Sequence, residues 1–473
     1  MYNPENQYRC TIIRGKSQKD IEDFLPAYAQ IINEICPCEE SIFENEFNKK
    51  LSGLIPPNSP QKTFNNHRTE IAGKLFGMYY KVHSDYNDDI YVYPGERTIK
   101  YLKDQDQPAF FKDICYKMQF PNGMTKFETV KERLGLGISI RPCCYIVEVL
   151  IEASRHDIVL TRNDIGYYVL NALDALKRIA SPYEIVETIV KDRNKGITSH
   201  VIGNPEKASS YNVQHINEQL NYMELANLIV LHNDGTVRLN EREIVTINLF
   251  ASHWDDDPAF NVAEYDLNSV QAREFFEFAW GQYYSALSAD AASFETSLSA
   301  LISDNDHSND TQTEQEDDNT VELGDEGEKY VYEYEKKRVS EFSARLANKV
   351  LAMGKTRGLG YDIQTVMAIP GDKAEYVKYI EVKATKRITA PDINDSLWLD
   401  TINMTRNEWV AAQQHGDYYS IYRVYFVRGN VLMYIIENPY KLYEKGTLSI
   451  TPTTYKMDFG NDAIDRVISK VDK

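Results

Sequence analysis

The sequence predicts a multidomain protein of mixed α+β and α/β class, and three observations lead to this prediction. A pattern of three helices followed by a hairpin occurs twice within the first 250 residues. A strongly acidic stretch then interrupts the chain at residues 304–328. Beyond it, an amphipathic helix precedes an apolar hairpin that carries charged residues inside its strands. A chain of 473 residues has room for several domains of ordinary size.

The acidic stretch marks the main boundary. It contains eleven acids, no Lys or Arg and no aromatic residue, so it buries too little apolar surface to fold and is expected to be a flexible linker. Removing these eleven charges from the net charge of −19 leaves −8 for the rest. The linker is either a plain spacer or a competitor of DNA for basic surfaces. We expect a first three-helix unit (1–140), a second (141–250), a helical connector (251–303), the linker (304–328) and a mixed-sheet domain (329–473).

The composition indicates a cytoplasmic protein. Apolar residues make up 42% of the chain, but no run approaches the roughly 18 residues of a membrane span, and no signal peptide opens the sequence. We therefore expect no membrane partner. The six cysteines lack zinc-ligand spacing and have no nearby histidine cluster, which predicts reduced thiols.

Each helix and hairpin of the repeated pattern has its own signal in the sequence. In the first copy, residues 21–36, 41–55 and 63–80 are expected to be helical, followed by a hairpin over 89–102 that turns at Pro94-Gly95. In the second copy, 162–180 is a predicted helix. The next helix begins at Ser181 with a capping box completed by Glu184. A third helix spans 211–229 and a hairpin turns at Asp234-Gly235.

The third helices of the two copies share their apolar positions at an offset of 145 residues. Three helices and a hairpin in this order predict a winged helix-turn-helix, and two copies in tandem predict a module that reads double-stranded DNA. The matching apolar residues are Ile71, Leu75 and Met78 in one copy, and Ile216, Leu220 and Met223 in the other.

The third helix of such a module enters the major groove, where Asn, Gln and Arg bond base edges. Alternatively, the polar residues are only the solvated face of an amphipathic helix. The candidates are Asn65, Asn66, His67, Arg68 and Lys74 in the first copy, and Asn212, Gln214, His215 and Gln219 in the second. Arg9, Arg14 and Lys16 lie in an N-terminal segment with few acids. This segment is either an arm that contacts phosphates or a plain strand.

The C-terminal hairpin carries the candidate chemistry. Asp362 opens an apolar run that breaks at Pro370-Gly371, and the second run contains Glu381 and Lys383. Side chains alternate along a strand, so Glu381 and Lys383 face the same way. Two carboxylates can hold a divalent cation, and a neighbouring lysine can orient or deprotonate a water. This pattern indicates a metal-dependent phosphodiesterase, although a solvated strand face with alternating charges would produce the same sequence.

The flanking elements complete the domain. A helix expected over 339–354 carries Glu341 in its first turn, as a third acid near the metal or as a partner of Arg345. After the hairpin, 406–416 is a predicted helix, and 418–427 and 431–439 are predicted strands, which gives a mixed sheet flanked by helices. Lys386, Arg387 and Arg406 are either phosphate contacts or ordinary surface charges.

These residues resemble known families. GYDI…IEVK, followed by NEWVAAQ…YRV, resembles the PD-(D/E)XK nuclease superfamily, near archaeal Holliday-junction resolvases and the NO VEIN C-terminal type of domain. YNPENQYRCTIIRGK, NNHRTEIAGKLFGMYY, DQPAFFKDICYKMQFPNGM and HINEQLNYMELANLI closely resemble the BpuJI family of Type IIS restriction endonucleases, over about residues 1–250.

The resemblance implies two winged-helix subdomains that read a short asymmetric DNA site, and a separable nuclease domain that forms a homodimer. It implies Asp362 and Glu381 as ligands of Mg²⁺, Lys383 as the catalytic lysine and Glu341 as the helix acid. The superfamily's proline before the aspartate is Tyr361 here. Two other functions stay open: a non-catalytic tandem winged-helix regulator and a structure-selective junction resolvase.

Overall fold

The fold is taken from a computed structural model of the whole chain. The structure describes residues 2–10, 18–84, 89–202, 210–302, 323–354, 358–371, 375–395 and 398–450. Arg14, Lys16 and residues 304–322 of the acidic stretch lie outside the described residues, as does the side chain of Asn212.

The first repeat forms helices around a three-stranded antiparallel sheet of order β1-β3-β2. The predicted turn at Pro94-Gly95 is wrong. The hairpin lies between β2 and β3, and Gly95 is the N-cap of α4. The close approach of Gly77, whose carbonyl oxygen would be 2.9 Å from an added Cβ atom, requires a glycine at this position. The elements are α1 (Gln18–Ile35), β1 (Cys38–Glu39), α2 (Glu40–Leu51), α3 (Gln61–Asn65), the π-helix η1 (Asn66–Leu75), β2 (Tyr79–His83), β3 (Ile90–Pro94) and α4 (Glu96–Asp104).

The second repeat has the same sheet order, β4-β6-β5. The predicted capping box of Ser181 and Glu184 and the hairpin at Asp234-Gly235 are confirmed. The single helix predicted over 162–180 is broken, because Ala172 bridges to Gln7 of the N-terminal segment. The elements are α7 (Pro142–Arg155), β4 (Leu160–Thr161), α8 (Arg162–Asp164), η2 (Ile165–Leu170), α9 (Leu173–Leu176), α10 (Pro182–Asn194), α11 (Ser210–Leu225), β5 (Ile229–Leu231) and β6 (Thr236–Leu239).

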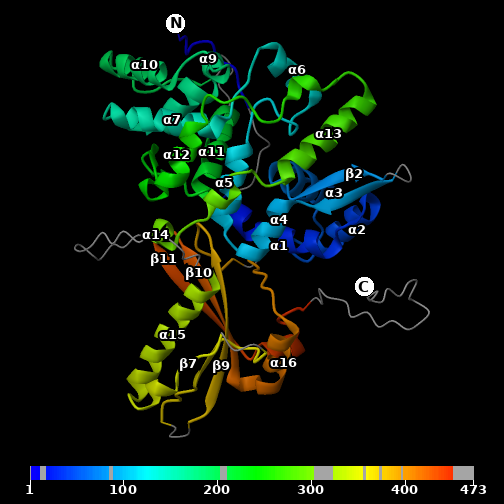
Figure 1. Ribbon diagram of the computed structural model, residues 1–473, viewed down its shortest axis with the longest axis vertical. Coiled ribbons are helices and arrows are strands. Elements are labelled where there is room, and N and C mark those ends of the chain that lie inside the picture. Colours follow the sequence, from blue (N-terminus) through cyan, green and yellow to red (C-terminus); the bar gives the residue numbers. More distant parts are fainter. Residues whose placement is uncertain are drawn as a thin grey trace, which may run out of the picture.

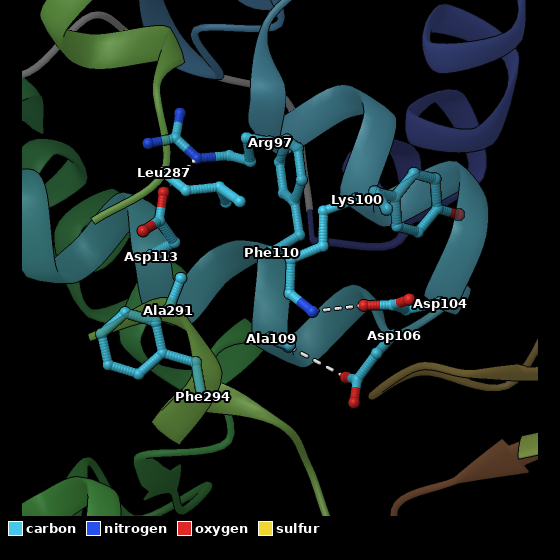
Figure 2. A pocket seen from close by; sticks show the side chains of 11 residues that line it. Arg97, Lys100, Asp104, Asp106, Ala109, Phe110, Asp113, Leu287, Ala291 and Phe294 are labelled. Atoms are coloured by element: carbon cyan, nitrogen blue, oxygen red, sulfur yellow. Dashed lines mark hydrogen bonds and ion pairs between the residues drawn. The ribbon is translucent and has the colours of Figure 1, made fainter. Parts of the chain in front are cut away.

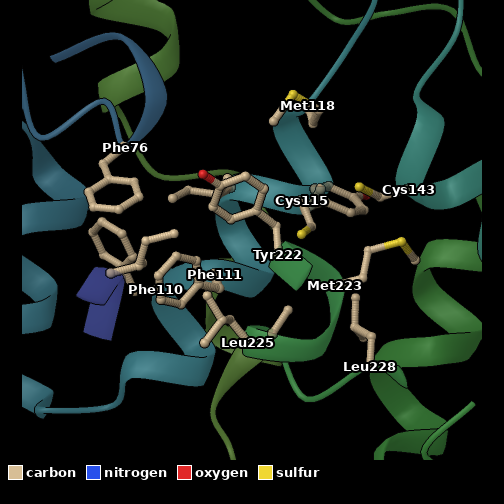
Figure 3. Packing of buried hydrophobic residues seen from close by; sticks show 14 of the residues in the cluster. Phe76, Phe110, Phe111, Cys115, Met118, Cys143, Tyr222, Met223, Leu225 and Leu228 are labelled. Atoms are coloured by element: carbon tan, nitrogen blue, oxygen red, sulfur yellow. The ribbon is translucent and has the colours of Figure 1, made fainter. Parts of the chain in front are cut away.

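A shared core joins the two repeats. Figure 3 shows aromatic and sulfur-containing side chains from α5 and α11 packed together, with Phe111 stacked on Tyr222 at 6.2 Å between ring centroids. The six apolar positions predicted from the repeat are all buried. The joining helices are α5 (Gln107–Lys117), α6 (Phe127–Gly135), η4 (Glu241–Glu243), α12 (Ile244–Ser252), η5 (Val262–Glu264), α13 (Val270–Ser285), η6 (Ala291–Phe294) and α14 (Leu298–Leu301).

The C-terminal part is a five-stranded mixed sheet of order β11-β10-β9-β8-β7, in which only the β9–β10 pair is parallel. Figure 1 shows α15 and α16 on opposite sides of this sheet. The helix predicted over 339–354 lies earlier in the chain and begins inside the range expected to be linker. The elements are α15 (Leu323–Phe342), η7 (Leu346–Lys349), β7 (Leu351–Ala352), β8 (Ile363–Val366), β9 (Val377–Lys386), α16 (Arg406–His415), η8 (Gly416–Tyr418), β10 (Tyr419–Val427), β11 (Asn430–Glu437) and α17 (Pro439–Glu444).

The sheet divides its side chains between the two helices. A Cβ atom added to Gly327 of α15 would lie 2.8 Å from the Ala384 side chain and 3.4 Å from that of Val382. The even-numbered residues of β9 therefore face α15, and Glu381 and Lys383 face α16, as strand alternation requires.

The end of β9 lies against the N-terminal part of the chain. The backbone N–H of Lys386 donates to the carbonyl of Gln105 at 3.0 Å, and its ammonium donates to the Thr296 carbonyl at 2.6 Å. That ammonium also lies 3.4 Å from the carboxylate of Asp106, which caps the first turn of α5 (Figure 2). Lys386 is buried in this contact, so both alternatives for it, a phosphate contact and an ordinary surface charge, are wrong.

Two arginines extend this contact. Arg387 donates to Asp23 at 2.7 Å, beside the fully buried Glu22, which accepts from the backbone N–H of Ile388 at 2.6 Å. Arg428, just past β10, pairs with Glu224 of α11 at 3.2 Å. Carboxylates of the N-terminal part thus pair with basic side chains of the C-terminal part.

Two further findings concern the whole chain. All six cysteines are free thiols, as predicted. Among the residues that the structure describes, no helix combines the length and the apolar character needed to cross a membrane.

Candidate active site and nucleic-acid interface

The structure brings together the three charged residues of the C-terminal hairpin. Asp362 lies directly before β8, and its Oδ2 accepts a hydrogen bond of 2.8 Å from the backbone N–H of Val382. Glu381 and Lys383 project from β9 on the same face, with Glu381 Oε1 and Lys383 Nζ 2.7 Å apart. An antiparallel β8–β9 pair and strand alternation are sufficient to place them together.

Sequence reasoning missed a fourth member, Glu408 of α16. Its Oε2 lies 2.9 Å from Lys383 Nζ and also accepts from the backbone N–H of Thr405 at 2.9 Å. The sequence signal was present as the capping-box spacing of Thr405 and Glu408, which predicts only the start of a helix.

Burial and the neighbouring charges shift the pKa values of these side chains. Burial raises the pKa of Glu381 to about 8; Lys383 opposes this rise, and Asp362 and Glu408 add to it. Burial also raises the pKa of Asp362, against the hydrogen bond from the Val382 N–H. Burial alone would lower the pKa of Lys383, but the carboxylates of Glu381 and Glu408 raise it above its ordinary value. Lys383 is therefore held as an ammonium.

Asp362 and Glu381 fit a divalent cation. They offer carboxylate oxygens side by side, the type of ligand that Mg²⁺ prefers. Lys383 pairs with both Glu381 and Glu408, and a cation on Asp362 and Glu381 would favour the ionised form of Glu381, whose pKa burial raises to about 8. In the part of the chain that the structure describes, no group of three or more His, Cys, Asp or Glu side chains is arranged to hold a metal ion.

Glu341 does not join the cluster, which corrects its assignment as the helix acid. It is exposed near the end of α15, and α15 covers the face of the sheet opposite Glu381 and Lys383. Its proposed partner Arg345 pairs instead with Glu375. The sequence placed Glu341 at the start of a helix that in fact ends one residue later.

The first candidate reading helix, α3 with η1, presents part of the predicted set. Asn65 is exposed and Asn66 is partly exposed. A shallow hollow of about 340 Å³ is lined by Lys62, Asn65, Asn66, Arg68, Thr69 and Glu70. Sequence reasoning missed Lys62 and Thr69, although their spacing of three to four residues from the asparagines places them on the same helical face.

Two residues of that helix are structural, against the prediction. His67 is 1% exposed, and its Nδ1 lies 2.5 Å from the Tyr28 hydroxyl. Arg68 is buried and donates to Glu44 and Asn48 of α2. Both side chains form hydrogen bonds to neighbouring helices, so neither is available to bond a base edge. Lys74 is partly exposed and pairs with Glu70 at 2.9 Å.

The second candidate reading helix, α11, is mostly internal. Gln219 is 2% exposed and donates to Cys143 Sγ at 3.1 Å, which corrects its assignment as a reader. Gln214 and His215 are partly buried, and His215 lies 3.6 Å from Glu218. In the N-terminal segment, Arg9 is exposed.

A separate cavity near the domain contact is too small for a ligand. It encloses about 20 Å³ between α4, α5 and the chain before η6, room for about one water molecule (Figure 2). Arg97 at its wall pairs with Asp113 at 2.6 Å.

Comparisons with known proteins separate the two parts of the chain. Residues 2–281 match the family model of restriction endonuclease BpuJI, N terminal. Residues 327–436 match the model of protein NO VEIN, C-terminal. A solved structure of pyrene- and phenanthrene-modified DNA in complex with the BpuJ1 endonuclease binding domain is 48% identical in sequence. The match covers 60% of this chain and 100% of that chain, with a TM-score of 0.57. No curated protein matches.

Proposed function

Because the chain belongs to the BpuJI restriction endonuclease family, we propose that it is a sequence-specific Type IIS restriction endonuclease. It would bind a short asymmetric site in double-stranded DNA and hydrolyse phosphodiester bonds outside that site with Mg²⁺. The observation that carries the proposal is the convergence of Asp362, Glu381 and Lys383 on one face of the C-terminal sheet.

Strand order supports the proposed domain assignment. Sheets of order β1-β3-β2 and β4-β6-β5, each preceded by helices, support winged-helix units at 1–140 and 141–250. Residues 251–303 connect them to the rest. The order α15-β7-β8-β9-α16-β10 around a mixed sheet supports a PD-(D/E)XK nuclease domain at 329–473, behind an acidic linker within 304–328.

The cluster supports a division of chemical roles. Asp362 and Glu381 would hold Mg²⁺, which when bound supplies positive charge to the scissile phosphate and acidifies a bound water. Lys383 projects an ammonium beside them and would orient the attacking water and stabilise the negative charge that develops on the phosphate. Its raised pKa favours these roles over that of a general base.

DNA reading is assigned to the residues that remain accessible. Asn65 and Asn66 would contact base edges, and Lys62 and Lys74 would contact phosphates beside them. Gln214, His215 and Asn212 on α11 are the corresponding candidates of the second unit. Arg9, with Arg14 and Lys16, would form an arm on the DNA backbone.

Two catalytic centres would let the protein cut both strands in one binding event, and each chain carries one such cluster among its described residues. We therefore propose that the nuclease domain pairs with a second copy on DNA to form a homodimer. Sedimentation of the protein with and without cognate DNA measures this directly.

The test is digestion of a sequenced plasmid with Mg²⁺, followed by mapping of the cut ends. Asp362→Ala, Glu381→Ala and Lys383→Ala are each expected to slow cleavage by roughly 100-fold or more. Glu444→Ala, which removes an exposed acid of α17, is the control and should cut normally.

Ends at fixed distances from one short motif support the Type IIS assignment. Full cleavage by all three variants would refute the assigned site. Tight, salt-sensitive binding without cleavage would favour a regulator, and preference for four-way junctions would favour a resolvase.

A further inference from the structure

We propose that Glu408 is a positioning residue: it holds the ammonium of Lys383 in place when Glu381 binds a cation. This inference rests on the proposed nuclease function and deepens it. Glu408 comes from α16, on the face of the sheet that carries Glu381 and Lys383. The helix of Glu341, the other acid considered from the sequence, covers the opposite face.

The geometry is a three-member ion cluster. Lys383 Nζ lies 2.7 Å from Glu381 Oε1 and 2.9 Å from Glu408 Oε2. The side chain of Lys383 is 21% exposed and that of Glu408 is 14% exposed. Both are sheltered from solvent, where a charge-assisted hydrogen bond is strong and an unpaired charge is costly.

Glu408 itself is held rigidly. Its backbone N–H donates to the Thr405 hydroxyl oxygen at 3.3 Å, and its Oε2 accepts from the Thr405 N–H, which completes a capping box. The helix is fixed to the sheet by the buried Ala411 and Ala412. Gly360, at φ +74°, approaches so closely that the Asn407 carbonyl oxygen would lie 2.5 Å from an added Cβ atom.

The cluster gives Glu408 a role distinct from that of Glu381. If Glu381 turns an oxygen to a cation, Lys383 loses that carboxylate as its partner. Glu408 then remains as the carboxylate that keeps the ammonium paired and directed toward the site. Without Glu408, cation binding would leave a sheltered ammonium unpaired, so both cation affinity and the rate of the chemical step should fall.

Helix capping is the competing explanation, because one oxygen of Glu408 serves both Thr405 and Lys383. Three variants separate these roles. Glu408→Gln keeps an oxygen for the Thr405 N–H and removes the charge. Glu408→Asp keeps the charge on a shorter side chain. Thr405→Ala removes the hydroxyl of the cap and leaves the Glu408 carboxylate in place.

The experiment uses the full chain and three measurements. These are the single-turnover cleavage rate at saturating DNA and Mg²⁺, the affinity for Mn²⁺ alone by titration calorimetry, and the thermal midpoint. Glu408→Gln should lower the rate and the Mn²⁺ affinity by roughly 10- to 100-fold each, with the midpoint unchanged. Glu408→Asp should recover part of both losses. Thr405→Ala should lower the midpoint and keep the rate and the Mn²⁺ affinity.

Two outcomes overturn the inference. One is a Glu408→Gln protein that cuts and binds Mn²⁺ like the unmodified chain. The other is a Thr405→Ala protein that loses as much rate and affinity as Glu408→Gln. If the unmodified chain cuts no DNA with Mg²⁺, the proposed nuclease function itself is refuted. If the unmodified chain and the Glu408→Gln protein both cut normally, only the role of Glu408 is refuted.

Discussion

Lys117 is a buried lysine whose titration should be measurable in the stability of the protein. Its ammonium lies over the ring of Tyr283 and donates to the carbonyls of Tyr283 and Ala286. Burial, aided by Arg97, lowers its pKa to about 8 from 10.5. Between these values the unfolded chain keeps a proton that the folded chain has lost, so stability should rise with pH, by up to about 1.4 kcal/mol per pH unit.

The measurement is the difference in thermal midpoint between the unmodified chain and Lys117→Met from pH 7 to 10. As the pH rises above about 8, the thermal midpoint of the unmodified chain should increase relative to that of Lys117→Met. Lys103→Met, at an exposed site of α4, is the control for general charge effects. A difference that stays flat across this range would contradict the assigned titration.

Single residues also mark where sequence reasoning stops. The convergence of Asp362, Glu381 and Lys383 could be predicted, because strand alternation relates positions that are close in the sequence and the family resemblance includes all three residues. His67 and Gln219 were not. Their partners, Tyr28 and Cys143, come from other helices, and only the folded chain shows that these polar groups are buried and used. Glu408 was hidden for a similar reason, since its contact with Lys383 spans 25 residues.

At the scale of the element, α3 and η1 have an accessible face, which we propose reads DNA, and a buried face that packs against other helices. Asn65→Ala and Asn66→Ala should weaken binding to the mapped site by about 1–3 kcal/mol each. Lys62→Ala should weaken binding to all sequences alike and reduce the salt dependence. These effects are expected without a change in thermal midpoint, because the three side chains lie on the accessible side of the helix.

The comparison variant is His67→Ala. It should lower the thermal midpoint, since the Tyr28 hydroxyl loses its partner in the core. Fluorescence anisotropy on cognate and scrambled duplexes at several salt concentrations distinguishes these cases. Equal losses of Asn65→Ala and Asn66→Ala on both duplexes would exclude base reading by this face.

Elements with strong local signals were predicted well. The helices α10, α11 and α16 and the turn at Asp234-Gly235 each carry a cap, an apolar period or a turn pair. The errors arose where distant chain intervenes. The N-terminal segment pairs at Ala172 and breaks a helix that the local pattern extends. Gly95 was taken for a turn, but it links β3 to α4 and lies close against Gly77 and Ser285.

At the scale of the whole molecule, buried ion pairs join the C-terminal domain to the rest of the chain. Arg387 is 4% exposed and bonds Asp23 beside the fully buried Glu22. Arg387→Ala would leave these carboxylates without their cation, at a cost of about 3–5 kcal/mol to docking. The radius of gyration from small-angle scattering should therefore increase as the domain separates.

Lys441→Ala provides the control, because its pair with Asp417 is exposed on both sides. It should leave the scattering unchanged. An Arg387→Ala protein as compact as the unmodified chain would show that the remaining contacts at Lys386 and Arg428 suffice for docking.

The last residue of the strand that carries Glu381 and Lys383 is hydrogen-bonded to Gln105, just before α5 begins. If the proposed Type IIS function holds, this contact fixes the distance between the strand proposed to cut and the helices proposed to read DNA. We would then expect side-chain docking, and not the length of the segment 303–322, to set the number of base pairs between the motif and the cut. Inserting residues there would leave the cutting distance unchanged, and a designer who wishes to move the cut would have to rebuild the surface around Gln105 and Asp106.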